Sequence, residues 1–257
     1  MIEIGIFGDF DANEYAHQAT NIGLHHAAEA LATDVRVNWP STPSLLGTDA
    51  ASVLARQDAL FAALGSPYRS FEGMLSGITY ARTHHRPFLG TCGGFQYALI
   101  EYARNVLGLR GAGSEENGPA EDALIAPVAC PVSGRRPGAP KLSGSNSISL
   151  RPGSQLARIY GCIEAQEHYF CNFEVNTKYR TRLETAGLVF AAEGDRGEPR
   201  AFELPGHPFF FATLYQPQRS SKPGHPHPLL KAYLEAAMSR TERASGICDA
   251  FADTRGR

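Results

Sequence analysis

The segment Gly90–Gly94 reads Gly-Thr-Cys-Gly-Gly and places Cys92 between an apolar run, Pro87–Leu89, and a helical pattern that begins at Phe95. A nucleophile in a sharp turn between a strand and a helix is held in a strained backbone conformation, and small neighbours leave room for the turn. The N-terminus of the helix stabilises a thiolate and directs backbone N–H groups at an oxyanion. The pattern therefore predicts a reactive cysteine at position 92. The alternative is an ordinary strand–helix turn that buries a cysteine by chance.

The other cysteines have no comparable neighbours; they are Cys130, Cys162, Cys171 and Cys248. The total of five is odd, the spacings are wide and no C-x-x-C pair occurs. We therefore expect reduced thiols in a cytoplasmic protein and no structural zinc site. These four cysteines are expected to be incidental, because a buried cysteine packs like a small hydrophobic residue.

Composition excludes several classes of protein. With 257 residues, 43% of them hydrophobic, the chain can bury a sizeable core and fits one large domain. A formal net charge of −2 provides no basic surface for nucleic acid. No apolar run approaches the roughly 20 residues of a membrane helix, and the N-terminus lacks the basic region of a signal peptide. No G-x-x-x-x-G-K-[ST] motif occurs, so we expect no ATP site of that type, no cofactor and no metal.

The elements that must position Cys92 alternate between strand and helix. Short apolar runs predict buried strands, and apolar residues at helical spacing predict helices between them. The expected strands are Ile2–Phe7, Val35–Trp39, Leu60–Leu64 and Pro87–Leu89, and the expected helices are Glu14–Ala32, Gly73–Thr83 and Phe95–Leu107. Such alternation predicts an α/β fold with a parallel sheet covered on both faces.

The second half of the chain changes character. Gly111–Gly153 is rich in Gly, Pro and Ser, which predicts long loops. Strand-like segments follow, and they predict added antiparallel strands and a closing core strand: Ser147–Leu150, His168–Val175, Leu188–Ala192, Arg200–Leu204 and Phe209–Leu214. A final helix is expected over Pro228–Met238. We expect a single domain over residues 1–240 and a frayed tail over residues 241–257.

Several long segments resemble the class I glutamine amidotransferases, and most closely the glutaminase domain of CTP synthase. They are Pro87–Gln96, Ile100–Leu109, Phe173–Asn176 with Tyr179-Arg180, Leu183–Phe190, Glu203–Phe210 and His227–Leu229. The resemblance implies an open, mostly parallel central sheet with helices on both faces and a small antiparallel extension. The synthase half of that enzyme is not in this sequence, so the resemblance does not imply CTP synthesis by this chain alone.

The resemblance also implies roles for particular residues. In the family, the elbow cysteine forms a thioester with the side chain of glutamine, which assigns that role to Cys92. The oxyanion hole would use the N–H groups of Gly93 and of the region of Gly65, although the loop Ala63–Pro67 has lost most of the family's glycines. The substrate-holding Gln and Glu of the family correspond to Gln96 and Glu116.

The residues that should assist the nucleophile depart from the family pattern. Gln216 stands at the position of the catalytic His and Gln218 at that of the Glu that orients it. A carboxamide is neither a base nor an acid near neutral pH. Asn172 stands where the family has an Arg that pairs with the α-carboxylate of glutamine, so a bidentate partner is replaced by a short neutral amide.

No histidine in the sequence is assigned as a replacement base. His168 is the nearest to Asn172 along the chain, but at roughly 3.3 Å per residue it lies about 13 Å away on the same strand face. Tyr169 and Cys171 alternate to the other face of that strand. The remaining histidines that we weighed fall in loops and turns of ordinary structural type: His84, His85, His207, His225 and His227.

Three functions remain open at the level of sequence. The favoured hypothesis is cysteine-dependent chemistry at Cys92 on a small amide or carbonyl substrate other than glutamine. The first alternative is a catalytically silent binding or regulatory subunit, with a separate synthetase-type protein as its partner. The second alternative is a working glutamine amidotransferase linked to the synthesis of CTP and other pyrimidine nucleotides.

Overall fold

The computed structural model describes residues 1–132 and 136–253, with side chains described up to residue 242. The strands are β1 (Ile2–Phe7), β2 (Val35–Asn38), β3 (Ala59–Ala62), β4 (Phe88–Thr91), β5 (Ala112–Ser114), β6 (Asp122–Pro127), β7 (Leu142–Leu150), β8 (Glu164–Cys171), β9 (Phe173–Val175), β10 (Val189–Glu193), β11 (Pro199–Glu203) and β12 (Phe210–Thr213). The α-helices are α1 (Tyr15–Ala30), α2 (Ala50–Ala55), α3 (Phe71–Thr83), α4 (Gly93–Asn105), α5 (Gln155–Tyr160), α6 (Arg180–Thr185) and α7 (Pro228–Asp253).

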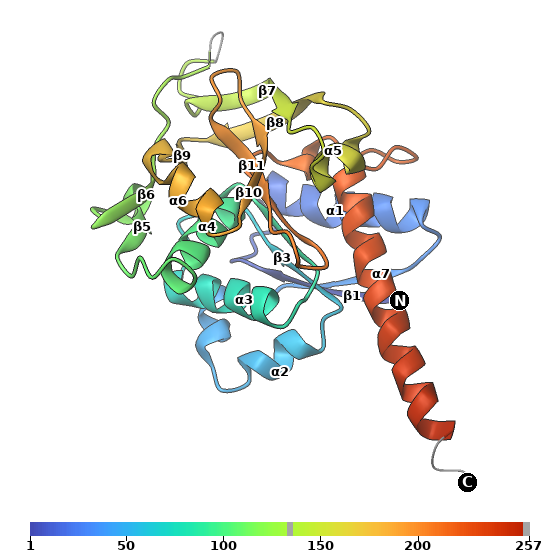
Figure 1. Ribbon diagram of the computed structural model, residues 1–257. Helices are drawn as coiled ribbons and strands as arrows, with labels where there is room; N and C mark the ends of the chain where they lie inside the picture. The colour runs from blue at the N-terminus through green and yellow to red at the C-terminus, as the bar shows by residue number, and fades with distance from the viewer. Residues whose placement is uncertain (133–135, 254–257) are drawn as a thin grey trace.

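A nine-stranded sheet in the order β2-β1-β3-β4-β12-β11-β10-β7-β8 forms the centre of the described chain. The first five of these strands pair in parallel, and the remaining four continue the sheet as an antiparallel extension. Helices α1 and α7 cover one face of the parallel part, and α3 and α4 cover the other (Figure 1). The predicted fold class is confirmed.

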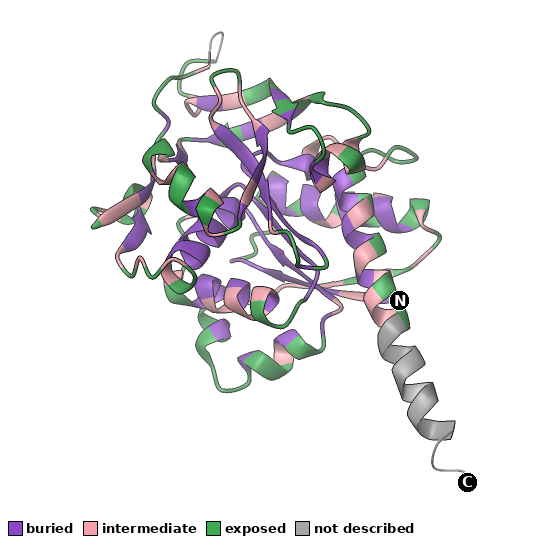
Figure 2. Cartoon of the chain, viewed as in Figure 1, coloured by how far each residue is buried: buried purple, intermediate pink, exposed green. Residues whose placement is uncertain are grey.

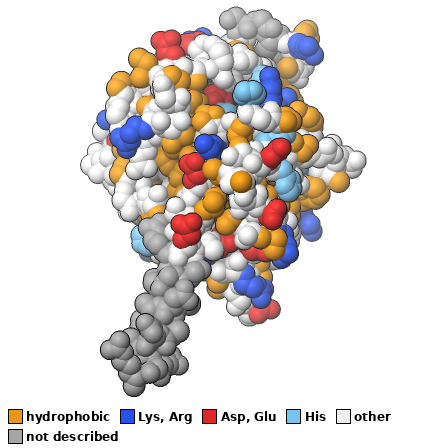
Figure 3. Space-filling model, turned by 90° about the vertical axis from the view of Figure 1, so that its right-hand side faces the viewer, with side chains coloured by type: hydrophobic (Ala, Val, Ile, Leu, Met, Phe, Trp, Pro, Cys, Tyr) orange, Lys and Arg blue, Asp and Glu red, His pale blue; other side chains and the backbone are white. Residues whose placement is uncertain are grey.

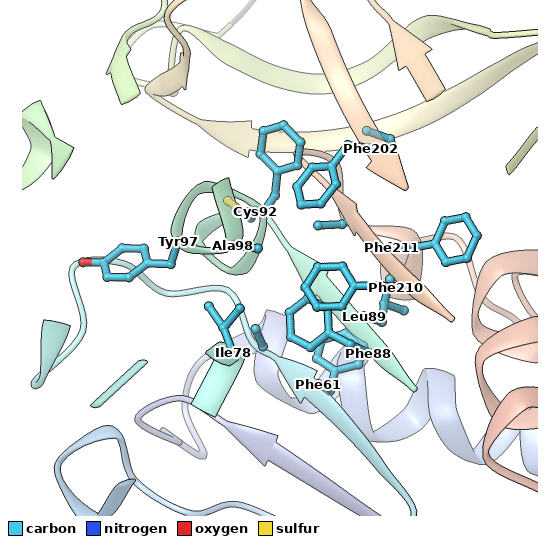
Figure 4. Close-up of a cluster of buried hydrophobic side chains, with 14 of the residues drawn as sticks. Phe61, Ile78, Phe88, Leu89, Cys92, Tyr97, Ala98, Phe202, Phe210 and Phe211 are labelled. Carbon is cyan, nitrogen blue, oxygen red and sulfur yellow. The ribbon is translucent and has the colours of Figure 1, made fainter. Parts of the chain in front are cut away.

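The three strands that carry the candidate site are buried on both faces. Every residue of β3, β4 and β12 is buried, as Figure 2 shows for the centre of the sheet. Phe88 and Phe210 stack across neighbouring strands with ring centroids 4.3 Å apart, and Figure 4 shows this aromatic cluster beside Cys92. Parallel strands buried on both faces read as continuous apolar runs, which is why the sequence pattern located them.

The expectation of long loops over Gly111–Gly153 is wrong. This stretch contains β5, β6 and β7, and β6 joins β5 and β9 in a second, three-stranded sheet. The strand partners explain the error, because β6 pairs with β9 and β7 pairs with β8, both of which lie later in the sequence. Pairing with distant strands stabilises polar, glycine-containing segments that have little local strand propensity. Residues 133–135 of this stretch lie outside the described part of the chain.

A buried ion pair links the second sheet to the main sheet. Glu174 of β9 accepts a hydrogen bond from the guanidinium of Arg200 on β11 at 2.8 Å, and its other oxygen accepts the N–H of Ala129 at 2.9 Å. Both oxygens of the buried carboxylate are therefore satisfied, which is the condition for tolerating such a charge in the interior.

The last helix is longer than expected. The sequence pattern predicts it over Pro228–Met238, whereas α7 is helical to Asp253. The frayed tail expected from Thr241 falls in part on residues 254–257, outside the described part of the chain, and it stays a prediction together with the single-domain boundary.

Two further observations concern the outside of the molecule. Among the helices of the described residues, none is long and apolar enough to cross a membrane. On the face in Figure 3, Lys and Arg side chains are interspersed with Asp and Glu, and neither sign of charge dominates.

His207, in the turn between β11 and β12, is expected to make stability depend on pH. Its Nδ1 accepts the N–H of Phe209 at 3.2 Å, so Nε2 carries the proton and donates to Ala81 O at 3.3 Å. Burial lowers the pKa of His207 below its ordinary value, despite these hydrogen bonds. The unfolded chain therefore takes up a proton first as the pH falls, and the stabilisation present above about pH 6.5 is lost below it.

The measurement is the melting temperature of the wild type and of His207→Asn between about pH 7.5 and pH 5. Asn keeps an acceptor near Phe209 N–H but does not titrate. We expect the melting temperature of the wild type to fall more steeply with acid than that of the variant. Parallel curves would show that His207 has the same pKa in both states.

Candidate active site

Cys92 occupies the turn between β4 and α4. Its backbone has φ +53° and ψ −107°, a conformation that costs a non-glycine residue about 1–3 kcal/mol. Two hydrogen bonds hold the turn: the N–H of Cys92 donates to Thr213 O of β12 at 2.8 Å, and its carbonyl accepts the N–H of Gln96 at 3.2 Å. The strained residue is thus fixed between the central sheet and the first turn of the helix.

The glycines around Cys92 are required by close contacts with neighbouring backbone and side-chain atoms. A Cβ on Gly94 would lie 2.2 Å from Ala62 O of β3, and one on Gly90 would lie 2.9 Å from the backbone of Gly94. A Cβ on Gly93 would lie 2.6 Å from the hydroxyl of Tyr68. Helix α4 therefore begins directly against β3, and this packing sets the position of Cys92.

A cavity of about 540 Å³ opens above Cys92. Its lining comes from the carboxyl ends of the parallel strands, the start of α1 and the end of β8, at the edge of an α/β sheet where ligands bind. The lining residues used below are Tyr15, His17, Gly65, Cys92, Glu116, Phe170, Cys171, Asn172, Gln216 and Arg219.

The carbonyl of Phe170 lies 3.9 Å from the sulfur of Cys92 and accepts a hydrogen bond from its thiol. Three further neighbours influence the pKa of the thiol: the thiol of Cys171, the carboxamide of Gln216 and the N–H of Gly93. The hydrogen bond with Cys171 and burial raise the pKa of Cys92 well above its ordinary value, against the lowering effects of Gln216 and Gly93.

The stabilisation of a Cys92 thiolate that is expected from the helix N-terminus is therefore outweighed by other influences on its pKa. Burial disfavours the charged form of a thiol, and the second thiol acts in the same direction. The pKa of Cys171, by contrast, is lowered, first by the hydrogen bond from Cys92 and against the effect of burial.

Gln216 and Gln218 are both buried, and Gln216 lines the cavity. Gln216 donates its backbone N–H to His168 O at 2.8 Å and accepts from Arg219 Nη1 at 3.4 Å through its side-chain oxygen. Gln218 Nε2 lies 3.4 Å from the hydroxyl of Thr91, and its Oε1 has no partner among the described atoms. The side chain of Gln216, not that of Gln218, contacts Cys92.

Of the three residues expected to hold substrate, two line the cavity and the third is fully buried. Glu116 lines the cavity, burial raises its pKa although Ser66 donates to it, and its Oε2 has no partner in the described chain. Asn172 also lines the cavity, but its Oδ1 accepts the N–H of Lys141 at 3.0 Å. Gln96 is fully buried, and its Nε2 lies 3.2 Å from both Cys171 Sγ and Phe173 O.

The histidines weighed as replacement bases lie elsewhere. His168 contacts the site residue Gln216 through its backbone carbonyl, which accepts the N–H of Gln216. His227 is buried against the carboxylate of Glu167 at 2.9 Å, in a cluster with Tyr160. Within the described residues, no hydrogen bond joins the thiol of Cys92 to an imidazole or a carboxylate.

Sequence reasoning missed three residues of the site. Cys171 is incidental by sequence pattern, yet it lines the cavity and contacts Cys92. His17 of α1 donates from Nε2 to Leu64 O at 3.2 Å, since its Nδ1 accepts a backbone N–H, and it faces the Gly65 loop. Arg219 lines the cavity with its guanidinium 5.5 Å from the ring of Tyr15.

The available signals for these three residues were weak. Cys171 precedes the recognisable segment Phe173–Asn176 by two positions, but strand alternation alone does not say which face meets the elbow. His17 and Arg219 lie on elements far from Cys92 in the sequence and reach the cavity only through the tertiary fold.

The fold is that of the class I glutamine amidotransferases. The family described as glutamine amidotransferase class-I matches residues 19–236, and this chain belongs to that family.

Within it, the chain is similar to CTP synthases. It is 33% identical to CTP synthase of Staphylococcus aureus over 239 residues and 30% identical to that of Rhizobium meliloti over 250 residues. These alignments cover 92% and 93% of this chain but 45% and 46% of the relatives, so the chain spans about half their length.

Solved structures agree with this placement. The glutaminase domain of a Trypanosoma brucei CTP synthase with bound acivicin superposes with a TM-score of 0.84 at 25% identity, covering 93% of this chain and 94% of that one. A glutamine amidotransferase from Thermotoga maritima shares the fold, with a TM-score of 0.52 at 9% identity over 93% and 97% of the two chains. The predicted resemblance to the glutaminase domain of CTP synthase is confirmed.

Proposed function

We propose that Cys92 attacks the carbonyl carbon of a small amide or other carbonyl compound that is not glutamine. The observation that carries this proposal is the set of groups around the thiol. Gln216, a carboxamide that the sequence resemblance aligns with the family's base, acts on the Cys92 thiol, and the neighbouring titratable group is the thiol of Cys171. A thiol that has no imidazole hydrogen-bonded to it among the described residues suits substrates whose leaving group departs without a strong acid.

In the addition step, Cys92 acts as the nucleophile and Cys171 as the proton acceptor. As Cys92 forms its S–C bond, its proton passes to the Cys171 thiolate, and the electron pair of the carbonyl moves to the oxygen. We assign the N–H of Gly93, adjacent to Cys92 at the start of α4, and the backbone near Gly65 at the cavity wall as the donors to that oxygen. Cys92 is assigned as the nucleophile because it directly precedes the N–H of Gly93 at the start of α4.

The cavity offers both signs of charge to a substrate. The unpartnered oxygen of Glu116 suits a hydrogen-bond donor or an ammonium group. Arg219 suits a carboxylate or a polarised oxygen, and no ion pair of Arg219 occurs among the described residues. Asn172 is engaged with Lys141, so the α-carboxylate anchor of a glutaminase is missing at that position. We therefore assign a compact polar carbonyl compound as the substrate class.

The test uses p-nitrophenyl acetate, an activated ester, with the full chain kept reduced. Acylation of Cys92 forms an S–C bond, breaks the ester C–O bond and releases p-nitrophenolate. We expect a burst of p-nitrophenolate about 10²-fold faster than in Cys92→Ser, with the acetyl group on the peptide containing Cys92. Cys130→Ser, which removes an exposed thiol, is the matched control and should behave like the wild type.

Two other outcomes would overturn the proposal. Absence of acetyl-Cys92, or its presence only on exposed cysteines, would favour a silent binding subunit, whose synthetase-type partner could then be sought by co-purification. Ammonia release from L-glutamine that is lost in Cys92→Ser would instead establish a working amidotransferase despite Gln216 and Gln218.

A further inference from the structure

Two buried thiols meet at the floor of the cavity. Cys92 comes from the elbow before α4 and Cys171 from the last position of β8, and each is 7% exposed. Both are free thiols, both line the cavity, and they are hydrogen-bond partners. The carbonyl of Phe170 also accepts from the Cys92 thiol, so the elbow and the end of β8 are in direct contact. Nothing in the proposed carbonyl chemistry requires its proton acceptor to be a second cysteine.

The surroundings of the two sulfurs differ. Gln96 directs its amide Nε2 at Cys171 Sγ from 3.2 Å, which stabilises a thiolate there. Cys171 Sγ also lies 3.2 Å from Phe173 O, and the pKa of Cys171 is lowered while that of Cys92 is raised. A thiolate beside a protonated thiol is the arrangement in which one sulfur attacks an oxidant and the other then displaces the oxidised group to form a disulfide.

We propose that Cys92 and Cys171 form a redox-active dithiol that reduces a small hydroperoxide and closes as a disulfide across the floor of the cavity. The pair shares Cys92 with the proposed carbonyl chemistry but does not depend on that chemistry. A hydroperoxide needs no oxyanion hole, which removes the reason for Cys92 to attack first. Closure of the disulfide would also remove the Cys92 nucleophile from the cavity.

The reaction proceeds in two balanced steps. The Cys171 thiolate attacks the terminal oxygen of the hydroperoxide, forming S–O and breaking O–O; the alkoxide leaves and takes a proton from solvent, and Cys171 becomes a sulfenic acid. Cys92 then attacks the Cys171 sulfur, forming S–S and breaking S–O, and hydroxide leaves with the Cys92 proton as water. Two thiols lose two electrons, and the hydroperoxide is reduced to an alcohol and water. A small dithiol returns two electrons and two protons.

The experiment treats the full chain with tert-butyl hydroperoxide and maps peptides by mass spectrometry without reduction. We expect a cross-linked Cys92–Cys171 peptide, one hydroperoxide consumed per disulfide, and repeated turnover when dithiothreitol is supplied. A variant with Cys130, Cys162 and Cys248 all replaced by Ser is the matched control and should form the same cross-link. In Cys92→Ser, the sulfenic acid on Cys171 should persist and be trapped by dimedone.

Some outcomes would contradict the redox pair. One is oxidation of Cys92 and Cys171 no faster than that of the exposed Cys130 and Cys162, with no cross-link between the buried pair. Another is a cross-link that disappears in the triple variant. We expect consumption of hydroperoxide by Cys171→Ser to fall by about 10-fold or more. The wild-type peptide map decides the question even if a buried Ser impairs folding, and because it uses no ester it is independent of the acylation test.

Discussion

Replacing Gln216 by histidine is expected to raise the rate at which iodoacetamide alkylates Cys92 at pH 7 by about 10²-fold. The Gln216 side chain contacts the thiol, so an imidazole at that position could take the proton and leave a thiolate beside an imidazolium. In the wild type, Cys171 and burial raise the pKa of Cys92. The thiolate, which is the species that reacts, is therefore scarce at neutral pH.

The measurement is the alkylation rate of the Cys92 peptide, followed separately from that of Cys171. Gln216→Asn is the matched control, because it keeps an amide and should not accelerate the reaction. If the His and Asn variants alkylate at the wild-type rate, the side chain at position 216 does not set the protonation of Cys92. The pH profile adds a second readout, since the rate in Gln216→His should rise with pH at a lower pH than in the wild type.

The largest loss of stability is expected from Gly94→Ala. The new Cβ would lie 2.2 Å from Ala62 O and 2.9 Å from Ala62 Cβ, so the start of α4 must move away from β3. The obstacle is backbone of the central sheet, which cannot turn aside as a flexible side chain can. We expect a loss of about 3 kcal/mol in the free energy of unfolding, at the upper end for overpacking. For a domain of this size, that lowers the melting temperature by roughly 6–12 °C.

Thermal melts of Gly94→Ala and of Gly47→Ala test this expectation. Gly47 is exposed, has φ −71°, and its nearest neighbour to a new Cβ is Ser44 O at 3.3 Å. Its substitution should change the free energy of unfolding by no more than about 0.5 kcal/mol. Equal melting temperatures for the two variants would mean that α4 is not packed against β3 as tightly as these contacts require. A shift of α4 should also slow any chemistry of Cys92.

Strands were predicted correctly from the sequence where the residues of the strand themselves carry the pattern. Continuous apolar runs located β1, β3, β4 and β12, because strands buried on both faces carry no polar alternation. Within Gly111–Gly153, the sequence pattern predicted only Ser147–Leu150, the end of β7. The other strand residues of this stretch were missed because their stability comes from partners elsewhere: β6 pairs with β9, and β7 pairs with β8. A glycine-rich, polar segment has no period that reveals such pairing in advance.

The sequence by itself determined the elbow, the glycines beneath it and the presence of amides at positions 216 and 218. These features depend on residue type at fixed spacing along the chain. Only the tertiary structure decided that Cys171 lies against Cys92 and that the pKa of Cys92 is raised, because both follow from the approach of β8 to the start of α4. Burial and contact between distant segments set the electrostatics of a site, and neither is encoded in local periodicity.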